Sequence, residues 1–96
     1  MRQYEAMFII DPDFETDAAN QLVENFKKLI QDQGGQIDGV DEWGKRKLAY
    51  EIKDFNEGYY VLMEFAAEPT LPAELERVYK ITDDIIRYLI ISKEDK

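Results

Sequence analysis

The order of hydrophobic periods along this 96-residue chain constrains its fold more than any other feature. Residues 4–10 form a short apolar run with one charge, as in a strand, and apolar residues recur every three or four positions over 15–33, as in an amphipathic helix. Strand-like segments follow at 36–53 and 59–67, then a helical pattern that begins near Pro72 and ends around 80–83, and a β-branched run over 85–91. The predicted order is therefore strand, helix, strand, strand, helix, strand.

The first strand and the first helix are the clearest elements. Both faces of the 4–10 segment are apolar, and this favours a central place in a sheet. Pro12 and its two flanking aspartates stop the segment. The apolar stripe of the 15–33 helix consists of Ala18, Leu22, Phe26, Leu29 and Ile30, with Val23 beside it.

The 36–53 segment is too long for one straight strand. At about 3.3 Å per residue it would span ~59 Å, whereas a domain of this size has a radius of gyration of about 12–13 Å. Its apolar residues also change parity, which predicts a bulge or bend near Gly39 and a second site at Gly44. Beyond that point Trp43, Lys45 and Lys47 are expected on one face and Arg46 on the other, with Leu48 and Tyr50. Residues 54–58 have turn chemistry, so this strand and the next form a hairpin.

This element order is that of the α+β class, in the ferredoxin-like split βαβ arrangement. We expect a four-stranded antiparallel sheet with two helices on one face, in a single domain over residues 1–96 with a short charged tail at 92–96. The helices would cover only one face of the sheet, so the other face must meet water or a partner.

The amino-acid composition excludes most kinds of catalytic site. The chain has no Cys and no His, which excludes disulfides, thiolate or imidazole metal sites, a Cys nucleophile and histidine acid–base catalysis. It begins without the pattern of a signal peptide, and its apolar runs fall short of the about 20 residues of a membrane span. We expect a small intracellular protein that is not an enzyme, with no cofactor, no small-molecule substrate and no membrane.

Charge is distributed unevenly along the chain. Twelve Lys and Arg against 21 Asp and Glu give a net charge of −9, yet Lys45, Arg46 and Lys47 are consecutive. This cluster beside aromatics suggests RNA binding, with cations on phosphates and Trp43 or Tyr50 stacked on a base. The alternative is that the lysines solvate an edge strand and protect it from aggregation. Because the protein is acidic, a basic helper would have to supply most of the affinity for RNA.

Three other motifs do not support the function that each would indicate. The 58–65 strand matches the RNA-recognition-motif signature poorly, since Glu57 stands at its basic position and Tyr60 at a small one. Acidic alternation from Asp11 resembles a calcium loop, but Thr16 and Leu22 occupy its required Gly and Glu positions. Acylphosphatases share the element order, yet residues 11–13 would repel a phosphate where those enzymes have a glycine-rich loop.

Three segments together resemble the bacterial small-subunit ribosomal protein six family, over essentially the whole chain. They are Met1-Arg2-Gln3-Tyr4-Glu5, Trp43-Gly44-Lys45-Arg46-Lys47-Leu48-Ala49-Tyr50 and Gly58-Tyr59-Tyr60. The middle segment is the most specific. Many members carry a longer C-terminal tail, whereas this sequence stops at Lys96.

The resemblance implies a ferredoxin-like fold and a structural role in the ribosome, in the cytoplasm. It also implies binding to the central domain of small-subunit ribosomal RNA together with ribosomal protein eighteen, a small basic neighbour. The residues that it nominates for RNA are Arg2, Trp43, Lys45, Arg46 and Lys47, with Arg2 joining the cluster if the first strand is a neighbour. Arg46 can instead contact protein. The rival hypothesis is a ferredoxin-like module that self-associates through its open sheet face and binds no RNA.

Overall fold

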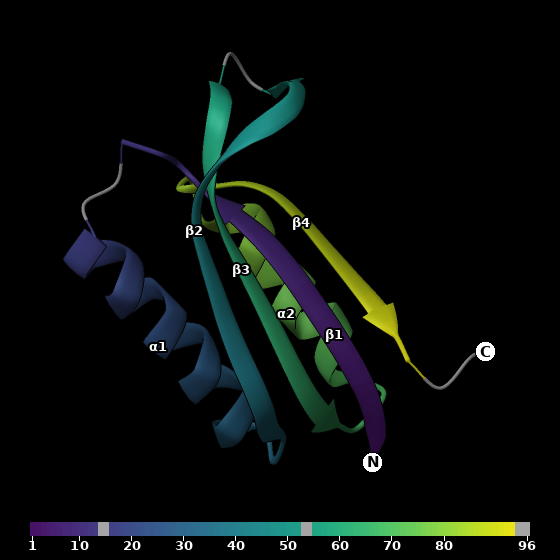
Figure 1. Cartoon of the computed structure of the whole chain (residues 1–96). Coiled ribbons are helices and arrows are strands. Elements are labelled where there is room, and N and C mark those ends of the chain that lie inside the picture. Colours follow the sequence, from purple (N-terminus) through teal and green to yellow (C-terminus); the bar gives the residue numbers. More distant parts are fainter. Residues whose placement is uncertain (14–15, 53–54, 94–96) are drawn as a thin grey trace.

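The computed structural model describes residues 1–13, 16–52 and 55–93, and for residues 16 and 49–52 it describes the backbone only. The elements are β1 (Arg2–Ile10), α1 (Thr16–Asp32), β2 (Gln36–Ile52), β3 (Phe55–Ala67), α2 (Leu71–Ile81) and β4 (Ile85–Ser92) (Figure 1). Their order is the one that the hydrophobic periods predict.

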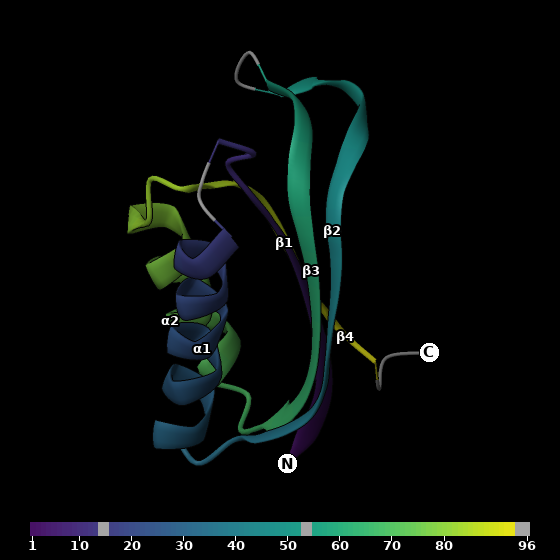
Figure 2. The same ribbon diagram turned by 60° about the vertical axis from the view of Figure 1, so that its left-hand side comes forward.

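The strands form one sheet with the order β2-β3-β1-β4. β1 is antiparallel to both β3 and β4, and β2 is antiparallel to β3. Both helices lie on the same face of the sheet, and its other face is open (Figure 2). The ferredoxin-like α+β architecture and the central place of β1 are therefore confirmed.

The core fills the space between the sheet and the helices. Phe8 from β1, Phe26 from α1 and Tyr79 from α2 meet at its centre, with ring centroids 4.8 to 5.2 Å apart. The buried side of α1 is rotated slightly from the predicted stripe. Ala19 is buried and Ala18 only half-buried, so the buried stripe runs through Ala19, Val23, Phe26 and Ile30, with Leu22 and Leu29 half-buried beside it.

β2 fits its 17 residues by breaking register with β3. Shifts fall between Ile37 and Gly39 and between Glu42 and Gly44, as predicted, and a third falls between Lys47 and Ile52. Gly44 has φ +78°, a left-handed conformation that glycine adopts without strain. The hairpin of β2 and β3 curves and projects beyond the helices (Figure 2).

The predicted loop over 54–58 is wrong for the part that the structure describes. β3 already begins at Phe55, which pairs with Ile52, and Glu57 and Gly58 pair with Lys47 and Arg46. The turn residues there suggested a loop, but cross-strand hydrogen bonding extends the strand through them. Residues 53–54 lie outside the described chain.

None of the helices within the described residues is long and apolar enough to cross a membrane.

Candidate nucleic-acid interface

The register of the strands arranges the open face of the sheet in rows. The first row, nearest the hairpin tip, runs across the four strands as Gly44, Tyr60, Ile9 and Arg87. The second row is Asp41, Leu62, Met7 and Leu89, and the third is Gly39, Glu64, Glu5 and Ile91. The face therefore changes from aromatic and basic at the hairpin end, through apolar, to acidic at the end where the chain begins.

Trp43 lies on this open face. Its indole stacks on the ring of Tyr60, with centroids 6.0 Å apart and planes 12° apart, and its Nε1–H donates to Asp41 Oδ2 at 3.0 Å. The side chain is 39% exposed, so one face of the indole is held by Tyr60 and the other is available. The prediction that Trp43 shares a face with Lys45 and Lys47 is wrong, because the bulge before Gly44 inverts the alternation at Trp43.

The three consecutive cations are divided between the two faces of the hairpin. Lys45 pairs with Tyr59 and Lys47 with Glu57, on the face that carries the helices, whereas Arg46 pairs with Gly58 on the open face. All three side chains are exposed, and the described residues offer them no carboxylate within ion-pair distance. Their charges are therefore available to an external anion.

Tyr59 lies on the helix-side face of the hairpin end and binds Glu42. Its hydroxyl donates to Glu42 Oε1 at 3.1 Å. Burial raises the pKa of Tyr59, and the hydrogen bond to Glu42 raises it further. The phenol therefore stays neutral and keeps the Glu42 carboxylate engaged beside Lys45.

Arg2 does not join the cluster. It pairs with Ala67 at one end of β3, whereas Lys45 pairs with Tyr59. These partners are separated by about 26 Å along β3, at about 3.3 Å per residue. β3 also lies between β1 and β2, so the first strand is not the neighbour that this expectation required.

A small apolar cluster fixes the hairpin end to the rest of the sheet. Ile9, Leu48 and Ile86 are buried in it, and Phe55 and Tyr60 pack against them. Gly58 is buried at its edge, where a Cβ would collide with Ile9 Cγ2. Glycine at this position therefore lets β3 approach β1 closely, and the cluster sets the orientation of the cations relative to the sheet.

The family model described as ribosomal protein S6 matches residues 3–92. The chain belongs to the ribosomal protein S6 family.

The chain is similar to individual S6 proteins over nearly all of its own length. The chain is 54% identical over 96 residues to small ribosomal subunit protein bS6 of Moorella thermoacetica, covering 100% of this chain and 98% of that protein. It is 54% identical over 95 residues to bS6 of Caldanaerobacter subterraneus subsp. tengcongensis, covering 99% and 100%. The crystal structure of 30S ribosomal protein S6 from Thermotoga maritima superposes with a TM-score of 0.92 at 43% identity, covering 96% of this chain and 87% of that one.

Membership of the S6 family makes this chain a structural protein of the bacterial small ribosomal subunit and not an enzyme. Its partners are therefore components of the ribosome, ribosomal RNA among them.

Two further residues complete the hairpin end. Arg87 and Tyr60 belong to the first row with Ile9, although both are remote in sequence from Trp43. Tyr60 belongs to the 58–65 segment, which sequence reasoning rejects as an RNA-recognition motif, whereas only the strand order identifies Arg87. Tyr50, the other stacking candidate, has its side chain outside the described residues, and Tyr4 of the first family-like segment is buried in the core.

Proposed function

We propose that this S6-family chain binds the central domain of small-subunit ribosomal RNA jointly with ribosomal protein eighteen, through two separate parts of its surface. The hairpin end, with Trp43, Lys45, Arg46 and Lys47, contacts RNA. The apolar and acidic rows of the open sheet face, away from the hairpin end, contact the basic protein. Arg2 lies at the other end of the sheet, so an RNA contact by Arg2 is separate from the contact made by the hairpin end.

The observation that carries the RNA assignment is the cluster of three exposed cations at the hairpin end, none of which forms an ion pair with a described residue. Three cations project there from a protein whose net charge is −9. Phosphate contacts supply most non-specific affinity for RNA, and each cation that neutralises a phosphate steepens the dependence on salt. Trp43 adds an aromatic surface already held flat by Tyr60.

The open face supports the protein assignment. Leu89 and Ile91 are 53% and 44% exposed, beside the half-buried Met7 and Leu62. Glu5 and Glu64 stand directly opposite each other in the next row. An apolar strip bordered by acidic side chains fits a basic protein surface better than it fits RNA.

The direct test is binding to a transcript of the central domain, with and without ribosomal protein eighteen. Replacing Lys45, Arg46 and Lys47 with Ala should weaken binding and flatten its salt dependence by about 2 to 3 in log–log slope, since each phosphate contact contributes about 0.7–0.9. A matched variant with Lys27, Lys28 and Lys80 changed to Ala carries the same charge change on the helices. If both variants lost the same RNA affinity, the effect would come from the net charge of the protein and not from the position of the cluster.

The self-association hypothesis makes a different prediction. If the exposed strip pairs with a second copy, Leu89→Glu should convert a dimer to a monomer in sedimentation equilibrium, while the triple alanine variant stays dimeric. Under the proposed function the isolated chain sediments as a monomer, and Leu89→Glu instead weakens binding of ribosomal protein eighteen.

A further inference from the structure

The hairpin end carries cations on both of its faces. Lys45 and Lys47 lie on the helix side and Arg46 on the open side, as their partners on β3 require. The two faces of one strand layer point in opposite directions. A single stretch of RNA backbone lying against Lys45 therefore does not also lie against Arg46.

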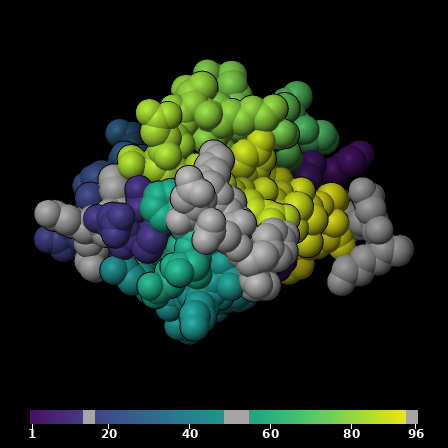
Figure 3. All heavy atoms as spheres, turned by 90° about the horizontal axis from the view of Figure 1, so that it is seen from above, coloured from purple at the N-terminus to yellow at the C-terminus, as the bar shows by residue number. Residues whose placement is uncertain are grey.

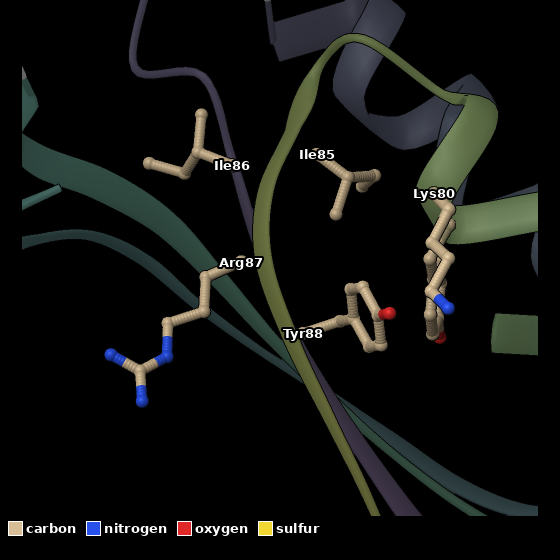
Figure 4. Close-up of a pocket in the computed structure, with 6 residues that line it drawn as sticks. Lys80, Ile85, Ile86, Arg87 and Tyr88 are labelled. Atoms are coloured by element: carbon tan, nitrogen blue, oxygen red, sulfur yellow. The ribbon is translucent and has the colours of Figure 1, made fainter. Parts of the chain in front are cut away.

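Arg87 strengthens the charge on the open side. Figure 4 shows the start of β4, shortly after the end of α2. Ile86 and Arg87 point to one side of the strand. Ile85 and Tyr88 point to the other side, toward Lys80. The register shift opposite Ile10 places two consecutive residues on the open side. Arg87 thus stands in the same row as Tyr60, on which Trp43 stacks.

Nothing in the described fold covers either face at this end. The hairpin projects past both helices (Figure 2). In the view from above, atoms of β2, β3 and β4 are visible at the surface together with those of α2 (Figure 3). The side chains of Lys45, Arg46, Lys47 and Arg87 are all exposed. Both faces are therefore accessible to large partners.

The two faces are also fixed relative to each other. Leu48, two residues beyond Arg46, is buried against Ile9 and Ile86, the residue before Arg87. The cations of the open side are thus tied to one apolar cluster. Lys45 is held by the pairing of its strand with Tyr59, whose side chain packs against the main core.

We infer that the hairpin end is a wedge that lies between two separate segments of RNA backbone. Lys45 and Lys47 contact one segment, and Arg46 and Arg87 contact the other, with Trp43 on the same side as the arginines. This inference rests on the proposed RNA binding and deepens it, because it assigns Arg87 to the interface and makes the interface two-sided.

Crosslinking from opposite faces tests the geometry. The chain has no cysteine, so single cysteines at Lys45→Cys and Arg46→Cys can each carry a benzophenone group without other changes. The labelled proteins are assembled into small subunits, irradiated, and the crosslinked nucleotides are mapped, with Lys28→Cys on α1 as the background control.

The outcomes separate the wedge from the proposed function. Crosslinks from positions 45 and 46 to two rRNA segments that are distinct in sequence support the wedge. Crosslinks from both positions to the same nucleotides, or RNA crosslinks from only one position, overturn it and leave RNA binding intact. If neither position reaches RNA in assembled subunits, the RNA assignment of the hairpin end itself is wrong.

Salt dependence provides a second readout. Arg87→Ala and Lys47→Ala should each reduce the log–log salt slope of RNA binding by about 0.7–0.9, and the double variant by about twice that. Arg87→Lys should restore the slope, which separates the charge from a folding defect, and Lys28→Ala should leave it unchanged. A normal slope for Arg87→Ala beside a reduced slope for Lys47→Ala removes Arg87 from the interface.

Discussion

Trp43 and Tyr60 form a stacked pair across β2 and β3, their planes only 12° apart. Since Tyr60 covers one face of the indole, only the outer face is open to an RNA base. We predict that Trp43→Ala weakens RNA binding by about 1–3 kcal/mol, the usual contribution of one stacked base, as measured by filter binding. Tyr60→Phe keeps the stack and should bind normally.

The same pair supplies a direct signal. Trp43 is the only tryptophan, so its fluorescence reports on this site alone. Its emission should change when the RNA transcript is added. In the triple alanine variant, which binds RNA more weakly, the emission should change less at the same concentration of transcript. Unchanged emission on saturation with RNA would remove the indole from the interface.

Much of this fold follows from the sequence, because period and length are local properties. The length of the 36–53 segment required bulges, and they occur next to Gly39 and Gly44. The consequence of the second bulge was not predictable in the same way. It moves Trp43 to the face opposite Lys45, and only the pairing with β3 shows which residue is inserted.

At the candidate site, the sequence identifies only those residues that are close together along the chain. Lys45, Arg46 and Lys47 are adjacent in sequence and therefore visible as a cluster. Strand order places Arg87 in the same row of the open face as Tyr60, and the pairing of β1 with β3 places Arg2 at the opposite end of the sheet from the cluster. Neither fact is present in any local pattern.

Gly58 should tolerate no side chain. In Gly58→Ala the new Cβ collides with Ile9 Cγ2, and we predict a loss of about 1–3 kcal/mol in the free energy of unfolding, as for overpacked cores. Chemical denaturation measures it. Gly39→Ala is the matched control on β2, since its Cβ would meet no atom within 4 Å.

A double variant identifies the collision as the cause. Ile9→Ala removes the colliding methyl group, so Gly58→Ala should cost less in that background than alone. Additive losses would point to the backbone of β3 and not to Ile9.

The Tyr79 hydroxyl is buried and finds no hydrogen-bond partner among the described residues. Tyr79→Phe should therefore raise the free energy of unfolding at pH 7 by about 1 kcal/mol, since an unsatisfied buried group costs about 1–3 kcal/mol. Urea denaturation at pH 7 checks this. A large loss of stability would mean that the hydroxyl has a partner.

Alkaline pH should reveal the same hydroxyl. Burial raises the pKa of Tyr79 in the folded protein far above the value of about 10 for an unfolded tyrosine. The stability linked to the neutral phenol is therefore complete below about pH 10 and declines above it. Tyr79→Phe should lose less stability than the wild type between pH 9 and 11 (about one unit on either side of that value), with the remaining decline due to groups such as Tyr59 and Tyr88, whose pKa values are also raised.

Glu5 and Glu64 oppose each other on β1 and β3, where like charges are destabilising. Lys93 Nζ lies 3.4 Å from Glu64 and relieves only part of this repulsion. Glu5→Gln should stabilise the isolated protein by about 0.2–1 kcal/mol and weaken its binding to ribosomal protein eighteen. Thermal unfolding and calorimetric titration test the two halves, with Glu24→Gln on α1 as the control. Tighter binding of the basic protein would contradict the assignment of this row.

The hairpin end rests on its own cluster of Ile9, Leu48 and Ile86, apart from the core beneath the helices. A region with so few buried side chains opens at a lower free energy than the rest of the molecule. Its backbone amides should therefore exchange with solvent while those of β1 stay protected. The hairpin end is therefore expected to be a separate cooperative unit, which holds its two faces in one arrangement when closed and opens before the rest of the sheet.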